Sequence, residues 1–105
     1  MAALKVRRRT HAEIRAAFER YRAESPRAAD AFLRKVRDAI AAITENPQQF
    51  HVLRGRLRRV MLPHSPYAVY FKIYRHHISV VGVVHLRRDP KHWLLREVPG
   101  ITVYA

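Results

Sequence analysis

The sequence predicts an α+β fold in which two helices pack as a hairpin on a small, mainly antiparallel sheet. Two amphipathic segments with helical spacing follow a short alternating segment near the N-terminus, and three segments of strand type come after them. The predicted order is therefore β-α-α-β-β-β, with a short C-terminal helix at the end. Because the composition does not shift along the chain, a single domain is expected over residues 1–105, with a core of about 4–98 and a tail of 99–105.

The N-terminal part of the sequence predicts a short strand followed by the first helix. Leu4 and Val6 alternate with basic residues, which is the period of a strand with one apolar face. Thr10 and Glu13 have the spacing of a capping box, so the helix is predicted to begin at Thr10. Its apolar residues recur at helical spacing and predict one face turned toward a core: Ile14, Ala17, Phe18 and Tyr21.

The second helix has the clearest signals in the sequence. Ser25 provides a hydroxyl N-cap, and Pro26 suits the first helical position because no N–H donor is needed there. Asn46 precedes Pro47 and is therefore disfavoured in the helical conformation, which predicts that the helix ends at this point. Between these ends one face is apolar over four turns: Ala29, Phe32, Leu33, Val36, Ile40 and Ile43.

Three strands are predicted after a polar connection that runs from Gln48 past Gly55. A short strand covers residues 57–62, and a segment rich in aromatic and β-branched residues covers 67–74. After a turn at Arg75 and His76, residues 78–86 are nearly continuous in apolar side chains, which is typical of a strand inside a sheet. Asp89 and Pro90 then predict the start of the short C-terminal helix, which would dock on the domain through Trp93, Leu94 and Val98.

The composition is strongly basic. There are 21 Lys and Arg against 8 Asp and Glu, which gives a formal net charge of +13 and a pI near 11.4. Such an excess attracts polyanions, so a nucleic acid, an acidic protein or a ribosome-like surface is expected as a partner. Charge alone does not choose among these partners. A highly charged surface without a specific acidic partner is the remaining alternative.

Several functional classes are disfavoured by the residues that the sequence lacks. Without cysteine there is no disulfide, zinc-thiolate site or thiol nucleophile. His76 and His77 are adjacent, so in a strand their side chains point in opposite directions, and no metal site is expected. No glycine-rich phosphate loop occurs, and no cofactor is expected. Because no stretch of about 18 apolar residues occurs, we expect a cytoplasmic protein and no membrane span.

Four segments occur in an order and spacing that are hard to obtain by chance: Leu57-Arg58-Arg59-Val60, Pro66-Tyr67, Tyr70-Phe71, and the strand exit Val83-Val84-His85-Leu86-Arg87-Arg88-Asp89-Pro90. Together they resemble the ParE/RelE superfamily of toxins from type II toxin-antitoxin systems. The second helix is similar to that family as well, through Pro26, Ala28, Ala29 and Phe32. The resemblance covers about residues 4–95, and its most specific part is the strand exit.

The resemblance implies a RelE/ParE-like fold and a toxin that is neutralised by a co-transcribed antitoxin. In that family the C-terminal segment of the antitoxin wraps the toxin and supplies complementary acidic groups, which would suit the +13 charge of this chain. A hetero-oligomer of toxin and antitoxin is therefore expected. We predict that the antitoxin crosses the helical hairpin and the edge of the sheet, and that it contacts the first helix at Ile14, Phe18 and Tyr21.

The resemblance leaves two targets open. RelE-like members cleave mRNA in the ribosome with a basic concave face that stabilises charge while the ribose 2′-OH attacks. ParE-like members inhibit DNA gyrase and have no established active site. RelE-like enzymes commonly have an arginine directly after the aromatic residue of this strand, where the present sequence has Ala68. Inhibition of gyrase by protein contact is therefore favoured, through a target-binding surface made of Arg58, Arg59, Arg75, Arg87, Arg88 and Trp93.

Two alternatives to gyrase inhibition remain. For a ribosome-dependent mRNA endonuclease, the catalytic candidates are Lys72, His85, Arg87, Arg88 and Tyr104. Among them, His85 could act as a general acid or base with its pKa lowered by neighbouring cations, or it could simply cap the strand end. The second alternative is a non-enzymatic nucleic-acid-binding module, whose DNA affinity would fall steeply with salt. Whether the protein is an enzyme stays open at this point, and a non-enzymatic toxin is favoured.

Overall fold

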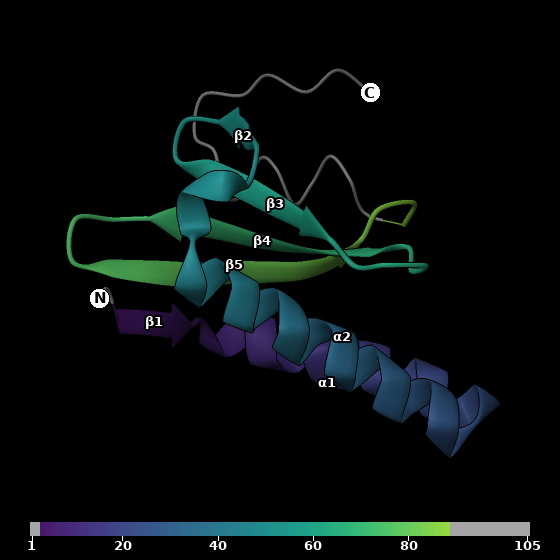
Figure 1. Cartoon of the computed structure of the whole chain (residues 1–105). Helices are drawn as coiled ribbons and strands as arrows, with labels where there is room; N and C mark the ends of the chain where they lie inside the picture. The colour runs from purple at the N-terminus through teal and green to yellow at the C-terminus, as the bar shows by residue number, and fades with distance from the viewer. Residues whose placement is uncertain (1–2, 89–105) are drawn as a thin grey trace.

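A computed structural model describes residues 3–88 (Figure 1). Its elements follow the predicted order with two short additions, a 3-10 turn and one further strand. They are β1 (Ala3–Val6), α1 (Arg8–Glu24), α2 (Pro26–Glu45), η1 (Pro47–Gln49), β2 (Val52–Arg54), β3 (Leu57–Met61), β4 (Tyr67–Ile73) and β5 (His77–His85). The predicted C-terminal helix, with Trp93, and the candidate Tyr104 lie outside the described residues.

The five strands form one mixed sheet in the order β1-β5-β4-β3-β2. β1 pairs with β5 in parallel, and every other neighbouring pair is antiparallel, which confirms the mainly antiparallel sheet. β5 therefore lies between two strands, as its continuous apolar sequence predicted. The β4–β5 register shifts between Tyr70 and Phe71, because Val81 is an extra residue at a β-bulge.

The ends of α2 confirm the signals read from the sequence. The backbone N–H of Ala28 donates to Oγ of Ser25 at 3.0 Å, and Pro26 is the first helical residue. The helix ends at Glu45, directly before Asn46 and Pro47. The same Ser25 also ends α1, since its backbone N–H donates to the carbonyl of Tyr21. One residue therefore forms the corner of the helical hairpin.

The predicted capping box at the start of α1 is wrong. The helix begins at Arg8 with Arg7 as its N-cap, and no side chain caps it. The Thr10 side chain is fully buried, and its Oγ1 donates to the carbonyl of Val80 at 3.2 Å. Oε1 of Glu13 accepts from the backbone N–H of Val83 at 3.3 Å. Both side chains thus bind β5, and contacts across seventy residues of sequence replace the expected local ones.

A strand also occurs where a polar connection was predicted. β2 has three residues and pairs antiparallel with β3 through an irregular register. Such a strand is too short to show an alternating pattern in the sequence. Gly55 turns the chain from β2 into β3 with a φ of 56°, a conformation that glycine adopts without steric cost.

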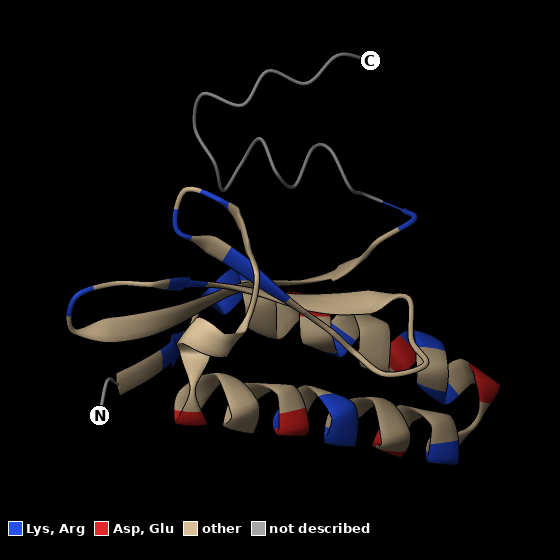
Figure 2. Ribbon diagram, turned by 45° about the horizontal axis from the view of Figure 1, so that its top comes forward, with Lys and Arg blue, Asp and Glu red and all other residues tan. Residues whose placement is uncertain are grey.

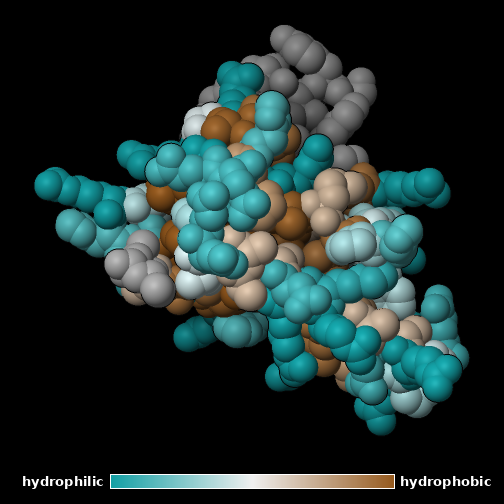
Figure 3. All heavy atoms as spheres, in the orientation of Figure 1, coloured by the Kyte–Doolittle hydropathy of each residue, from teal (hydrophilic) through white to brown (hydrophobic). Residues whose placement is uncertain are grey.

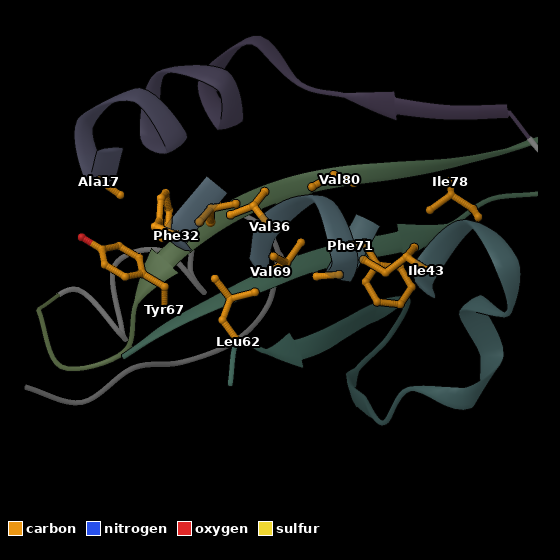
Figure 4. Packing of buried hydrophobic residues seen from close by; sticks show 12 residues of the cluster. Ala17, Phe32, Val36, Ile43, Leu62, Tyr67, Val69, Phe71, Ile78 and Val80 are labelled. Atoms are coloured by element: carbon orange, nitrogen blue, oxygen red, sulfur yellow. The ribbon is translucent and has the colours of Figure 1, made fainter. Parts of the chain in front are cut away.

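The main core lies between the two helices and one face of the sheet (Figures 1 and 4). Figure 4 shows side chains from both layers meeting there, and the most deeply buried include Phe32, Ile43, Val69, Phe71, Ile78 and Val80. Alternate residues of each strand point to the other face. In the space-filling view, hydrophilic side chains project around the rim of the molecule, and apolar atoms show between them (Figure 3).

Candidate functional site

Acidic and basic residues are distributed unequally between the two layers. All acidic residues of the described structure lie on α1 and α2, where they are mixed with basic ones (Figure 2). Residues 46–88, which follow α2, contain no Asp or Glu and eight Lys or Arg residues: Arg54, Arg56, Arg58, Arg59, Lys72, Arg75, Arg87 and Arg88. The sheet layer thus carries most of the net positive charge of the described residues, and an excess of one sign attracts ions of the other.

One end of the sheet meets α1 at a partly open pocket of about 260 Å³. It is lined by the last two turns of α1, the start of β4 and the exit from β5. Its lining residues carry several hydrogen-bond donors and a single acidic group: Arg20, Tyr21, Glu24, Pro66, Tyr67, His85 and Arg88. We call this hollow the α1–β5 pocket.

Tyr67 connects the α1–β5 pocket to the main core. Its ring is 5 % exposed and packs on Phe32 with the ring centroids 5.4 Å apart. Its hydroxyl accepts a hydrogen bond from Nη1 of Arg20 at 3.2 Å. A buried aromatic ring with a bonded polar end holds its position well, because burial fixes the ring and the hydrogen bond fixes its rotation. Arg20 is thereby oriented by a residue 47 positions away in the sequence.

The orientation of His85 is set by the turn that follows β5. Nδ1 of His85 accepts from the backbone N–H of Arg87 at 3.2 Å, so this nitrogen carries no proton in that arrangement. The proton of the neutral ring is then on Nε2, which is the nitrogen left to donate. The imidazole ring also packs edge-on against Tyr67, at 5.1 Å between centroids. The predicted strand-end role of His85 is therefore present in the structure.

The surroundings of His85 lower its pKa below the ordinary value of 6.5. Burial is the largest cause, and the positive charges of Arg88, Arg20 and Arg87 follow in that order. The sequence indicated the two arginines that follow β5 but neither burial nor Arg20. A lowered pKa favours the neutral form of His85, and Arg20 and Arg88 supply the formal positive charge of the pocket.

The opposite face of the sheet is apolar at its centre. Ala68 is fully buried there and lies in a cluster with Tyr70 and Val84. Leu57 and Val81 complete the buried part of that cluster. Within residues 3–88, neither helix lies across this face (Figure 1). The position where an arginine was expected in a RelE-like enzyme is thus part of a second hydrophobic cluster.

Comparison with known proteins identifies the family. A family model described as "ParE toxin of type II toxin-antitoxin system, parDE" matches residues 4–90. The chain belongs to this family. The resemblance inferred from the strand exit and the second helix is therefore confirmed. No curated protein matches the chain.

A solved structure supports the fold of this ParE family member. The chain is similar to one described as "Chromosomal ParDE TA system from P. aeruginosa", with a TM-score of 0.71 and 17 % sequence identity. The match covers 81 % of this chain and 96 % of that chain. At such low identity the likeness shows the fold, and it confirms the α+β, RelE/ParE-like architecture.

The predicted target-binding arginines do not form a single patch in this ParE family member. Arg58 turns back onto the chain before β2 and donates to the carbonyl of Phe50 at 2.8 Å. Arg59 is on the opposite face of β3, paired with Tyr70. Arg75 lies in the β4–β5 turn, at the other end of the sheet from the α1–β5 pocket.

Arg87 and Arg88 are adjacent in sequence but line different hollows on the two sides of Pro66. Arg88 lines the α1–β5 pocket, whereas Arg87 lines a second hollow with His64, Met61 and Leu86. The described structure thus places Arg88 with Arg20, a residue that the sequence did not suggest.

The nuclease candidates are separated as well. Lys72 pairs with Ser79 in the β4–β5 ladder, on the face opposite the helices, whereas His85 is on the helix-covered face. Ser79 and His85 are six residues apart on β5, which corresponds to about 20 Å at about 3.3 Å per residue. Lys72 and His85 therefore cannot contact the same phosphate group.

The predicted antitoxin-binding residues form the inner stripe of α1. Ile14, Phe18 and Tyr21 are half-buried and pack against the main core. Tyr21 also stacks on Phe32, with centroids 5.1 Å apart, and lines the α1–β5 pocket. Of these three residues, Tyr21 is the one that lines the α1–β5 pocket.

The sequence did not suggest Arg20, and it placed Tyr67 in a strand and in the family pattern without a hydrogen-bond partner. The available signal was that a buried tyrosine hydroxyl needs a hydrogen-bond partner, although nothing in the sequence indicates which residue provides it. Among residues 3–88, no group of three or more His, Asp or Glu could hold a metal ion. In the same part of the chain, neither helix is both long and apolar enough to cross a bilayer.

Proposed function

We propose that this chain is a toxin that arrests growth by contacting DNA gyrase, and that an acidic antitoxin neutralises it. Both partners would be met in the cytoplasm, where the toxin would form a hetero-oligomer with its antitoxin. The proposal assigns the inhibition to contact between proteins, with no chemical step on the toxin. Membership of the ParE family and the cationic sheet support it.

The observation that carries the choice of target is the burial of Ala68. Ribonucleolytic members of the superfamily need several positioned donors around the reacting phosphate, because charge develops on it in the transition state. In this chain the corresponding position is 0 % exposed and surrounded by apolar side chains. Two of the catalytic candidates, Lys72 and His85, are on opposite faces of the sheet. This arrangement favours inhibition by contact over RNA cleavage.

The test is a supercoiling assay with the purified chain and DNA gyrase. We expect supercoiling to be lost as the toxin is added in excess, and to return when the antitoxin is added. Gyrase that remains fully active at a large excess of toxin would refute the proposal. Transcripts from induced cells supply the second measurement, since new cut sites in mRNA would favour the endonuclease instead.

Experiments with the same purified chain distinguish a toxin from a simple nucleic-acid-binding module. Binding through phosphate contacts releases counterions, so DNA affinity would fall steeply between low and physiological salt. Such a module would also leave growth unaffected. We expect growth arrest on induction, and gyrase inhibition that does not follow the affinity of the chain for DNA.

A further inference from the structure

The donors of the α1–β5 pocket converge from three elements that are distant in sequence. Arg20 comes from α1, Tyr67 from β4 and Arg88 from the turn after β5, with His85 between them. The Tyr67 hydroxyl accepts from Arg20, which leaves its own proton to donate. Nε2 of His85 donates as well, because Nδ1 is already an acceptor for the Arg87 N–H. Arg20, Tyr67, His85 and Arg88 therefore line the pocket with side chains that can donate to an entering group, and Glu24 is the one acidic side chain among the lining residues.

We propose that the α1–β5 pocket is a carboxylate-binding site that seats one acidic side chain of the neutralising partner. An arginine fork matches the two oxygens of a carboxylate, and a hydrogen bond to a charged group is stronger than one between neutral groups. Arg20 is held by Tyr67 before any ligand arrives, so less rotational freedom is lost on binding. This proposal rests on the proposed function for one point, that the partner is the antitoxin.

The carboxylate of Glu24 favours a single carboxylate over a nucleic-acid backbone as the ligand of the pocket. With the carboxylate of Glu24 on the wall, the charged groups of the pocket are Arg20, Arg88 and Glu24, which leaves a single net positive charge for the ligand. A single phosphodiester carries the same single negative charge as a carboxylate and would match this net charge equally. A strand of nucleic acid, however, would bring neighbouring phosphates close to Glu24, whereas an isolated acidic residue in a peptide brings none.

The pocket is wide enough for a side chain with its backbone, and it is not purely polar. The faces of Pro66, Tyr67 and Tyr21 contribute apolar surface beside the donors. Such a mixture suits the methylene groups and the carboxylate of one Glu or Asp side chain. Pro66 also borders the second hollow, where Met61, Leu86 and Arg87 lie, so a peptide that leaves the α1–β5 pocket has a continuing surface.

The experiment follows the ring resonances of His85 by NMR in the full chain at constant ionic strength. The probes are acetate and the peptide acetyl-Ala-Glu-Ala-amide, compared with the same peptide carrying Gln in place of Glu. We expect acetate and the Glu peptide to shift the His85 resonances saturably, and the Gln peptide to leave them unchanged. A shift that never saturates, or one that the Gln peptide reproduces, would overturn the proposal.

Three variants test whether the Glu peptide binds in the α1–β5 pocket. Arg20→Gln and Arg88→Gln should each weaken binding of the Glu peptide about tenfold, because each removes a hydrogen bond to a charged group. Arg75→Gln is the matched control, since it removes the same charge at the other end of the sheet and should change the affinity less than about twofold. Equal losses in all three variants would mean that net charge alone attracts the peptide, and the site would be refuted.

Dimethyl phosphate tests the nucleic-acid alternative. It carries one negative charge, as a phosphodiester does, and we expect it to bind more weakly than the Glu peptide. Tighter binding of dimethyl phosphate would assign the pocket to a nucleic-acid backbone and reject the carboxylate. Because no gyrase or antitoxin enters these titrations, a negative result leaves the proposed function intact. A failed supercoiling assay likewise leaves the titration valid.

Discussion

The two ends of the β4–β5 hairpin are both basic, but they use their cations differently. At the turn end, Arg56 lies over the Tyr74 ring at 5.5 Å and donates to the carbonyl of Ile73, while His77 stacks on Tyr74 at 4.8 Å. At the exit end, Arg20 is held by a hydroxyl at the wall of a hollow that Arg88 shares. Positive charge alone therefore does not make a site. A hollow with oriented donors is needed as well.

Truncating the tyrosine at each end should give the largest difference. Tyr67→Ala removes a buried ring that packs on Phe32, Tyr21 and His85, and we expect a loss of about 3–5 kcal/mol in the free energy of unfolding. Tyr74→Ala removes a half-buried ring and should cost about 1 kcal/mol. Urea denaturation of both variants measures the two values. Equal losses would mean that the two ends are equally packed.

Removing only the tyrosine hydroxyl should also affect stability differently at the two ends of the hairpin. Tyr67→Phe abolishes the hydrogen bond from Arg20 and should cost about 1 kcal/mol. Tyr74→Phe should cost almost nothing, because no described residue is hydrogen bonded to that hydroxyl. The same denaturation experiment applies. A neutral Tyr67→Phe variant would show that Arg20 is not held by this bond.

The cation at the turn end should contribute less to stability than the buried tyrosine ring at the exit end. Arg56→Ala removes a partly exposed cation–π contact, for which we expect a loss of about 0.5–1 kcal/mol. Arg56→Lys keeps the charge and separates the effect of charge from that of the planar guanidinium. A loss well above this range would show that the turn depends on the arginine for its conformation.

The titration of His85 reports the burial and the positive charges at the exit end. We expect a pKa below 6.5 by NMR, moved upward in Arg88→Ala and unchanged in Arg75→Ala. Because the folded protein takes up this proton less readily than the unfolded chain, the group lowers stability as the pH falls below 6.5 and has no such effect well above it. A pKa at or above 6.5 in the wild-type protein would contradict the arrangement of burial and cations around the ring.

Much of the fold could be predicted because its signals are local. Ser25 and Pro26 fix one end of α2, and Pro47 fixes the other, through backbone chemistry that involves only neighbouring residues. The alternation of β4 and the apolar run of β5 likewise reflect which faces are buried. β2 was missed because three residues with an irregular register show no period.

The candidate site could be predicted only in part, because its contacts are distant in sequence. His85 was found through its basic neighbours, which follow it directly. Arg20 reaches Tyr67 across 47 positions, and no pattern in the sequence reports that proximity. Thr10 shows the same limit of sequence-based prediction, because here a local pattern predicted the wrong contact. Its spacing to Glu13 suits a local cap, yet both side chains gain more by binding the backbone of β5.

The position of β5 has a consequence for how the protein is made. β5 joins β1 to the rest of the sheet, and its backbone binds the side chains of Thr10 and Glu13 from α1. During synthesis, residues 77–85 emerge long after α1. Until they do, β1 lacks its strand partner and Thr10 lacks its acceptor. A nascent chain is therefore unable to close its N-terminal layer, and a folded toxin exists only when translation of the described domain is nearly finished.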